Sequence, residues 1–210
     1  MSEKPIMEIA IRKVKAGMET AFVDARTAFI SELKQQVGVE KDWEFKSFFT
    51  MPGEDDTDVF VGMTRYASAE TASSIAGKLM NTELAGNFFA TFDMKAFVMV
   101  QPVDGGDFVL EDYINAPGLV LEVAVRVPTV SEEEFQTGRD AFFGVVAQQP
   151  GYIMDREFID LQSGAKVVLI AWESLEHFQA ALGVLQTREE MGRFFGMIEA
   201  KAYQAVQPVS

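Results

Sequence analysis

The chain has 210 residues and is acidic: 18 Lys and Arg stand against 32 Asp and Glu, which gives a formal net charge of −14. This charge argues against nucleic acid and anionic membrane surfaces as partners, because both bind basic surfaces. The sequence contains no cysteine, and therefore no disulfide and no thiol nucleophile. It also shows no signal peptide and no apolar run of about 18 residues that could span a membrane, so we expect a cytoplasmic protein without a membrane partner.

A segment near the end of the chain repeats an earlier one at an offset of 106 residues. The motif Glu-x-x-Gly-x-Phe-Phe occurs at Glu83–Phe89 and again at Glu189–Phe195. Each copy is followed, at the same distance, by Lys-Ala and then by Val-Gln-Pro-Val. We therefore predict a duplicated chain, with a first domain at 1–104, a linker at 105–118 and a second domain at 119–210.

Hydrophobic patterning predicts the element order β-α-β-β-α-β in both domains. In the first domain the expected strands cover 7–14, 42–48, 59–66 and a segment ending at 101–103, and the expected helices cover 18–36 and a segment that begins at Ser68. In the second domain the expected strands cover 121–127, 155–161, 166–172 and a segment ending at 207–209, and the expected helices begin at Ser131 and Ser174. Gly38 and Gly151 are expected to end the first helices, and the Gly-x-Phe-Phe motifs to lie on the second helices. The apolar linker residues Phe108–Leu110 are expected to pack against a domain.

Three short motifs carry a resemblance to a known family. They are Lys15-Ala-Gly17 followed by Phe22, Gln149-Pro-Gly151-Tyr152, and Trp172-Glu-Ser174-x-Glu176-x-Phe178. With these motifs the chain resembles, over nearly its whole length and twice, the antibiotic biosynthesis monooxygenase (ABM) group of the dimeric α+β barrel superfamily. The resemblance implies an α+β fold in which two tandem ferredoxin-like β-α-β-β-α-β repeats form an intramolecular, pseudo-dimeric α+β barrel. It leaves open whether two such pseudo-dimers pair again as a homodimer.

The resemblance also implies one of two chemistries: cofactor-independent oxidation of a small quinol-like or phenol-like aromatic by oxygen, or degradation of haem. Haem-degrading relatives carry an Asn on the first strand, a Trp after the third strand and a His further along. Trp172 fits the second position, but the first strands hold no Asn, and the single histidine, His177, follows Trp172 too closely. We therefore expect a monooxygenase without cofactor or metal. The alternative is a non-catalytic small-molecule-binding or stress-associated module; the partner in either case is a small apolar or aromatic molecule.

Five residues are candidates for catalysis. Trp172 and Tyr66 stand at equivalent strand ends, where they either line a substrate pocket or close the core. His177 is either a general base or a surface residue at a helix start. Arg12 and Arg126 are candidates for stabilising the charge of a developing oxyanion.

Both arginines belong to a repeated pattern, Glu8-x-x-x-Arg12 and Glu122-x-x-x-Arg126. Residues four apart on a strand share a face but lie about 13 Å apart, so neither pair can close on itself. This face lies opposite the apolar residues of the strand and is expected to point into the shared interior of the barrel. The four charges are predicted to pair either across strands or across the pseudo-twofold axis between the domains, with Glu44 and Glu157 as candidate further partners. Such a network either fixes how the domains dock or forms an anion or carboxylate site.

Overall fold

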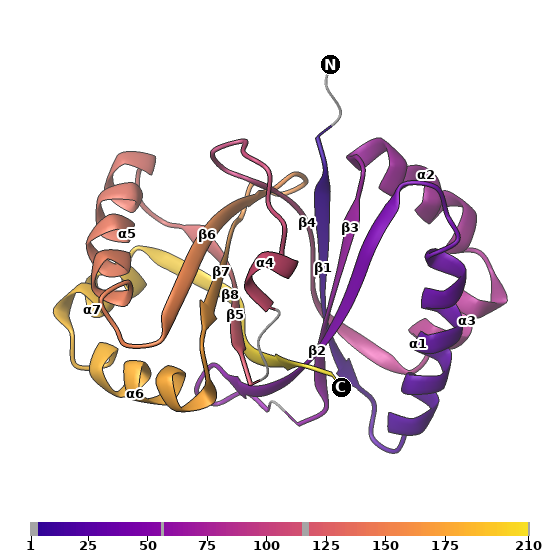
Figure 1. The fold of residues 1–210 in the computed structure, drawn as a ribbon, viewed down its shortest axis with the longest axis horizontal. Helices are drawn as coiled ribbons and strands as arrows, with labels where there is room; N and C mark the ends of the chain where they lie inside the picture. The colour runs from indigo at the N-terminus through magenta and orange to yellow at the C-terminus, as the bar shows by residue number, and fades with distance from the viewer. Residues whose placement is uncertain (1–3, 56, 115–117, 210) are drawn as a thin grey trace. The chain divides into compact units, whose positions relative to one another are not determined.

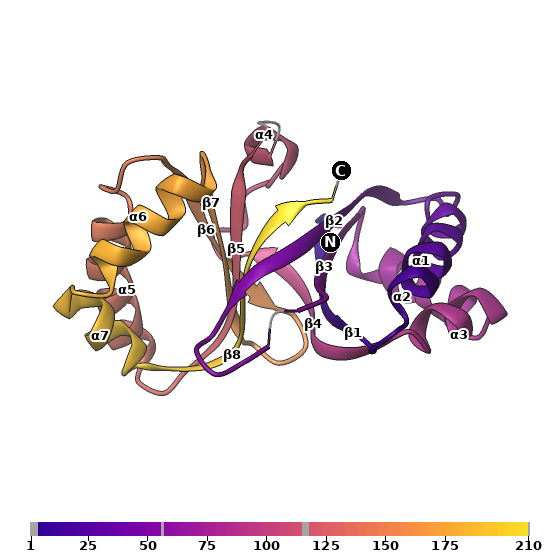
Figure 2. The same cartoon turned by 90° about the horizontal axis from the view of Figure 1, so that it is seen from below.

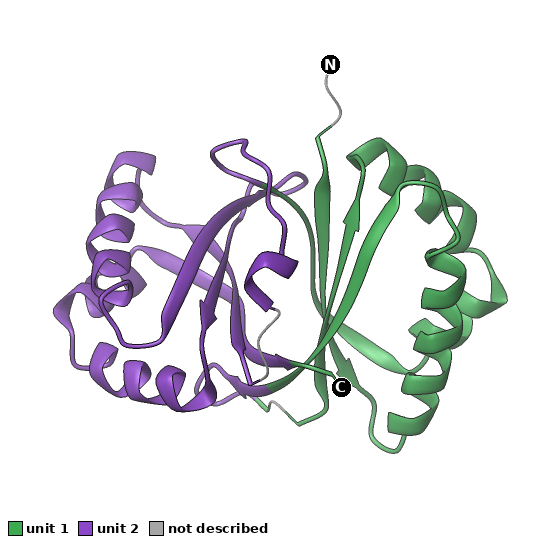
Figure 3. Cartoon of the chain, viewed as in Figure 1, with its two compact units in different colours: residues 1–47, 55–101, 208–210 green, residues 48–54, 102–207 purple. Residues whose placement is uncertain are grey.

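The computed structural model describes residues 4–55, 57–114 and 118–209. The chain divides into two compact units (Figure 3). Unit 1 takes its residues from 1–47, 55–101 and 208–210, and unit 2 takes its residues from 48–54 and 102–207. Residues 115–117 of the predicted linker, and with them most of its Asn-Ala-Pro-Gly turn, lie outside the described part of the chain.

Unit 1 has the element order β-α-β-β-α-α-β (Figure 1). Its elements are β1 (Ile6–Val14), α1 (Glu19–Leu33), β2 (Val39–Thr50), β3 (Val59–Tyr66), α2 (Ala69–Leu79), α3 (Glu83–Phe89) and β4 (Phe92–Pro102). The sheet is antiparallel: β1 lies between β3 and β4, and β2 lies beside β3. The three helices cover one face of this sheet (Figure 2).

Unit 2 repeats this order and adds a short helix in front of it. Its elements are α4 (Glu111–Ile114), β5 (Val120–Pro128), α5 (Glu132–Val146), β6 (Tyr152–Asp160), β7 (Lys166–Trp172), α6 (Leu175–Leu185), α7 (Glu189–Phe195) and β8 (Ile198–Pro208). Here β5 lies between β7 and β8, and β6 lies beside β7, again antiparallel. The helices α5, α6 and α7 cover one face of the sheet (Figure 2).

Polar caps begin three of the helices where the sequence predicts them. The side chains of Ser68 and Ser174 accept hydrogen bonds from the backbone N–H groups three residues further on, at the start of α2 and α6. Ser131 and Glu134 form a reciprocal capping box at the start of α5. These three helix starts are confirmed.

Two details of the predicted helices are wrong. The Gly-x-Phe-Phe motifs form separate short helices, α3 and α7, and in unit 1 the cause is local: Thr82 caps α3 by accepting a hydrogen bond from the N–H of Ala85. The first helices, α1 and α5, also end earlier than predicted, so that a turn separates each helix from Gly38 or Gly151. These glycines have φ of +92° and +76°, a left-handed conformation that leads the chain into β2 and β6.

The apolar part of the linker packs on unit 2, as predicted. Phe108 stacks on Tyr113 with ring centroids 5.6 Å apart and meets Phe158 edge-on at 5.0 Å. Leu110 is buried. Among the described residues, none of the helices is long and apolar enough to cross a membrane.

Candidate functional site

The charged residues of β1 and β5 face the helices of their own unit. The guanidinium carbon of Arg12 lies 5.4–5.8 Å from the ring centres of three phenylalanines on α1, α3 and β4, and that of Arg126 lies 5.5–5.9 Å from three on α5 and α7. The prediction that this face points into a barrel interior is therefore wrong. Both faces of β1 are buried, so apolar alternation alone does not show which face meets the helices.

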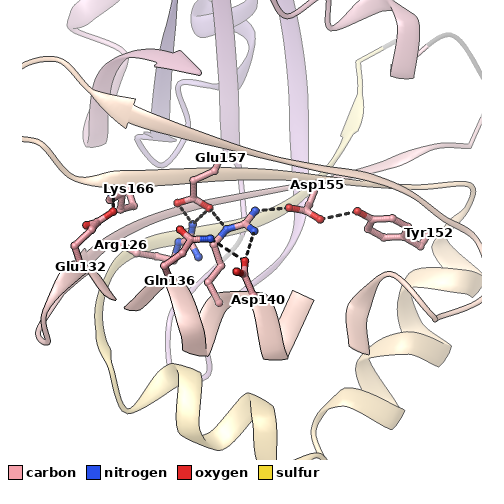
Figure 4. A network of polar contacts seen from close by, with 9 residues as sticks. Arg126, Glu132, Gln136, Asp140, Tyr152, Asp155, Glu157 and Lys166 are labelled. Carbon is pink, nitrogen blue, oxygen red and sulfur yellow. Dashed lines mark hydrogen bonds and ion pairs between the residues drawn. The ribbon is translucent and has the colours of Figure 1, made fainter. Parts of the chain in front are cut away.

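In unit 2, Arg126 belongs to a network of ion pairs and hydrogen bonds between β5, β6 and α5 (Figure 4). Arg126 Nη2 donates to both carboxylate oxygens of Glu157, at 2.6 and 2.8 Å. Arg139 on α5 donates through Nε to Glu157 at 2.9 Å and through Nη2 to Asp155. Tyr152 closes the network by donating its hydroxyl to Asp155 at 2.6 Å. The predicted pairing of Arg126 with Glu157 is confirmed.

Unit 1 holds the equivalent arginine–carboxylate pairs, and there Thr64 is the hydroxyl donor to the aspartate. Arg12 Nη2 donates to the two oxygens of Glu44 at 2.8 and 2.7 Å, while Arg26 pairs with Asp42 at 2.7 Å and with Glu44. The arginine reaches Glu44 by crossing β3 at Gly62, where a Cβ atom would collide with its guanidinium group. The predicted partner of Arg12 is confirmed as well.

These networks bind each arginine to its own carboxylates. Burial lowers the pKa of Arg12 and of Arg126, and the neighbouring Glu44 and Glu157 oppose that shift. For Arg139, burial also acts to lower the pKa, but hydrogen bonds and charges from the two carboxylates outweigh it and raise the pKa. An arginine held in this way is committed to ion pairs, so the geometry favours a structural role for both predicted arginines.

Glu122 differs from every carboxylate in these networks, because its partners are neutral. Trp172 donates Nε1–H to Glu122 Oε1 at 2.5 Å, and Tyr203 donates its hydroxyl to Oε2. Glu122 is 8% exposed, and within the described residues no charged side chain contributes to its pKa shift. Burial raises the pKa of Glu122, and the two hydrogen bonds oppose the rise only in part. A buried carboxyl group of this kind is a candidate proton acceptor.

Glu8, the equivalent residue of unit 1, has a longer hydrogen bond and a positively charged neighbour. The Tyr66 hydroxyl lies 3.4 Å from Glu8 Oε2. Burial raises the pKa of Glu8 to about 7, while the positive charge of Arg12 acts to lower it. Phe97 stands where unit 2 has Tyr203: each lies opposite the alanine two residues after the glutamate, Ala10 or Ala124. Unit 1 therefore lacks the second hydrogen-bond donor.

Further aromatic rings adjoin the two donors of Glu122, and of these residues Trp172 and Phe178 are buried. The rings of Phe49 and Tyr203 meet edge-on at 6.1 Å, and those of Phe49 and Phe178 meet at 5.8 Å. Phe178 and Trp172 belong to one apolar cluster, against which Phe49 packs. We call these four residues, Phe49, Trp172, Phe178 and Tyr203, the aromatic rim. They provide ring faces and edges beside a single buried carboxyl group.

Tyr66 and Trp172 lie in the cores beneath the helices, with exposures of 4% and 1%. Tyr66 packs in a cluster with α1 and α2 residues, and Trp172 packs with α5 and α6 residues. Their bodies close the core, and their polar atoms turn to Glu8 and Glu122 respectively. A catalytic contribution from either residue thus remains a prediction that depends on the neighbouring glutamate.

His177 sits at the start of α6 with its side chain 38% exposed. Its Nδ1 faces the hydroxyl of Ser174 at 3.2 Å and the carboxylate of Glu173 at 3.5 Å. The imidazole covers Gly151, where a Cβ atom would collide with it; in unit 1 Thr71 covers Gly38 in the same way. This repeated contact indicates a packing role at the helix start.

The five candidates therefore do not converge on one site. Arg12 and Tyr66 belong to unit 1, whereas Arg126, Trp172 and His177 occupy separate places within unit 2. Glu122 enters the sequence-based prediction only as a member of the charged pattern with Arg126, and Tyr203 does not enter it. The sequence does hold one signal: at the repeat offset of 106 residues Tyr203 replaces Phe97, while the glutamate recurs at an offset of 114 residues as Glu8 and Glu122.

No family model matches the sequence, and no curated protein matches it. Solved structures do match it along the whole chain. An anthrone oxidase-like protein superposes with a TM-score of 0.59 at 13% identity and covers 99% of this chain and 92% of its own. A putative monooxygenase from Fusobacterium nucleatum subsp. nucleatum ATCC 25586 gives 0.55 at 12% identity, covering 100% and 94%. A putative chlorite dismutase gives 0.64 at 8% identity, covering 100% and 96%.

The chain shares its fold with these proteins. The comparison shows a common fold and establishes neither the predicted superfamily nor the ABM group for this chain. Identities this low concern the fold alone, and a fold of this kind carries several chemistries.

A heme-binding protein from Thermus thermophilus also matches, with a TM-score of 0.59, 12% identity, and coverage of 99% of this chain and 92% of its own. Haem iron is most often held by a histidine. The single histidine here packs on Gly151 and turns Nδ1 to Ser174 and Glu173. In the described part of the chain, no group of three His, Asp or Glu residues is arranged to hold a metal ion. The residues present therefore do not fit a haem site.

Proposed function

We propose that the protein is a cofactor-independent monooxygenase of the ABM type that acts on a small aromatic, quinol-like or anthrone-like substrate, and that unit 2 carries the reaction. In this proposal the two units are tandem ferredoxin-like repeats. The observation that carries it is the environment of Glu122, a buried carboxyl group held by Trp172 and Tyr203 without a cation. The likeness to a putative monooxygenase and to an anthrone oxidase-like protein supports it at the level of fold.

The proposed reaction needs only a proton acceptor and oxygen. Glu122 removes a proton from an acidic C–H of the substrate, and the resulting carbanion adds O₂ to give a peroxide anion. Glu122 returns its proton to that anion. The hydroperoxide then loses water as the second C–H is deprotonated, so one oxygen atom remains as a carbonyl group and the other leaves as water. Burial strengthens a carboxylate as a base, which suits it to the first step.

Trp172 and Tyr203 hold the carboxylate in place during these proton transfers. Each donates to a different oxygen of Glu122, so the carboxyl plane is fixed from both ends. Donors of this kind favour the charged form and so act against the rise that burial causes in the pKa of Glu122. They therefore act as positioning residues in the proposal.

The duplication supplies a matched control for the test. Oxygen uptake would be measured with anthrone and with 1,4-dihydroxynaphthalene for the unaltered protein, Glu122→Gln and Glu8→Gln. We expect Glu122→Gln to lose at least about a hundredfold in kcat, in the range of general-base contributions, while Glu8→Gln stays within about twofold. Equal losses in both variants, or full activity in Glu122→Gln, would refute the assignment of Glu122.

The second candidate function is a non-catalytic module that binds small molecules. The observation in its favour is that Arg12 and Arg126 form ion pairs with Glu44 and Glu157, so neither arginine is placed to stabilise a developing oxyanion. Retention of an aromatic ligand through purification, together with no oxygen uptake on any substrate of the panel, would favour this function over the oxygenase.

A further inference from the structure

Glu122 and Glu8 occupy equivalent positions in the two units, but they differ in whether a positive charge lies nearby. Glu8 lies within the influence of Arg12. Among the described residues, the hydrogen-bond partners of Glu122 are the indole N–H of Trp172 and the hydroxyl of Tyr203. Within the described residues no cation offsets a negative charge at Glu122. The arginine nearest along its strand, Arg126, is bound to Glu157 at 2.6 Å.

The surroundings of Glu122 disfavour a negatively charged ligand. A second negative charge beside Glu122 would meet a carboxyl group that no cation screens, and two carboxylates that share a buried site cannot both stay ionised without a large cost. Desolvating the charge of the ligand would add to that cost, and the two printed partners of Glu122, Trp172 and Tyr203, are both neutral. A neutral hydroxyl group meets neither penalty and can donate to the carboxylate of Glu122 or accept from its protonated form.

The aromatic rim adds the second requirement. Phe49, Phe178, Trp172 and Tyr203 place aromatic surface beside the carboxyl group, and Tyr203 and Phe49 are only partly buried. Edge and face contacts with these rings favour a flat aromatic ligand. In unit 1 the position of Tyr203 is taken by Phe97, which is 43% exposed and offers no hydrogen bond.

We propose that unit 2 binds uncharged hydroxyaromatic molecules at Glu122 and rejects their carboxylate-bearing analogues, and that Tyr203, which Phe97 replaces in unit 1, positions the carboxyl group for this binding. The inference rests on the proposed function for the location of the site. It adds the charge class of the ligand and names the residue that separates the two repeats. Tyr203 acts through Glu122, since its hydroxyl holds the carboxyl group in position.

The test compares 2-naphthol with 2-naphthoate, two probes of nearly equal shape that differ in charge at neutral pH. Binding to the full chain would be measured by titration calorimetry without oxygen, so that turnover plays no part. We expect 2-naphthol to bind at least about tenfold more tightly than 2-naphthoate. The difference should fall below about threefold in Glu122→Gln, because the amide carries no charge and can donate to a carboxylate.

Two further variants test the role of Tyr203. Tyr203→Phe should weaken 2-naphthol at least about threefold, in line with the loss of one hydrogen bond, while Phe97→Tyr should stay within about twofold. Equal or tighter binding of 2-naphthoate by the unaltered protein would overturn the inference, and so would binding of neither probe. The first comparison needs no variant, so a folding defect in Glu122→Gln leaves it decisive.

The outcomes separate this inference from the proposed function. Charge-selective binding without oxygen uptake on any substrate would refute the oxygenase and leave the inference intact. Oxygen uptake that depends on Glu122, combined with equal binding of the two probes, would refute the inference alone.

Discussion

Trp172 and Glu122 are joined inside unit 2 by a hydrogen bond of 2.5 Å between the indole Nε1 and the carboxyl Oε1. Their equivalents in unit 1, Tyr66 and Glu8, are separated by 3.4 Å between the hydroxyl and the carboxyl oxygen. The same sheet position thus carries a short contact to a buried, uncompensated carboxyl group in one unit and a long contact in the other. Each variant in unit 2 consequently has a counterpart in unit 1.

The first prediction concerns that hydrogen bond. Trp172→Phe keeps an aromatic ring in the core but leaves a buried carboxyl oxygen without its donor, so we expect the free energy of unfolding to fall by about 2–4 kcal/mol. Tyr66→Phe removes a contact of 3.4 Å and should cost less than about 1 kcal/mol. Urea unfolding followed by circular dichroism measures both. Similar losses in the two variants would show that the short contact contributes nothing of its own.

The second prediction concerns the ion-pair network of unit 2. Arg126→Met preserves much of the packing among the phenylalanine rings but leaves Glu157 with Arg139 alone, and breaking a buried pair in this way costs about 3–5 kcal/mol. The double variant Arg126→Met/Glu157→Leu should lose less than the sum of the single variants, by at least about 1 kcal/mol. Thermodynamic cycles from urea unfolding test this coupling, and strict additivity would contradict it. Arg12→Met and Glu44→Leu form the matched cycle in unit 1.

The third prediction concerns pH. Burial raises the pKa of Glu8 from 4.5 to about 7 against the charge of Arg12, with Tyr66 and Asp42 as the other neighbours. The folded state then binds more protons than the unfolded state between these values, so this residue's contribution to stability is present below pH 4.5 and is lost as pH rises to about 7. The loss amounts to about 3 kcal/mol.

Glu8→Gln should remove this pH dependence. The variant should be more stable than the unaltered protein at about pH 8, and the difference should shrink as the pH falls towards the ordinary pKa of a glutamate. Unfolding free energies measured at intervals across this range test the sign as well as the size. A stability of Glu8→Gln that runs parallel to that of the unaltered protein at every pH would show that Glu8 titrates normally.

The fourth prediction concerns the turn before β6. Gly151 has φ of +76°, and a Cβ atom there would collide with the imidazole of His177. Gly151→Ala should therefore cost more than the about 1–2 kcal/mol of left-handed strain alone. The combination with His177→Ala should recover the steric part but not the conformational part. Thermal unfolding of the two single variants and the double variant separates these contributions; no recovery in the double variant would mean that His177 does not press on this turn.

The local features of this fold could be read from the sequence because they depend on short-range patterns. The bounds of β3 and β7 agree with the prediction to the residue, since both segments are short apolar runs between clear turn and cap signals. The starts of α2, α5 and α6 follow from serine caps. The separate helix α3 was missed because the cap at Thr82 interrupts a segment that otherwise continues the helical pattern.

The sequence by itself predicted a duplicated chain, the order of the elements in each copy apart from the separate helices α3 and α7, and Glu44 and Glu157 as candidate partners of the charged residues on the first strands. Only the tertiary structure decided which face of β1 and β5 meets the helices. Both faces of these strands are buried, so the alternation of apolar residues along the strand does not distinguish them. The tertiary structure alone also brought Trp172 and Tyr203, which lie 50 and 81 residues from Glu122 in the chain, to the same carboxyl group. Such contacts depend on strand order and register, which set neighbours across the sheet and leave no mark on spacing along the chain.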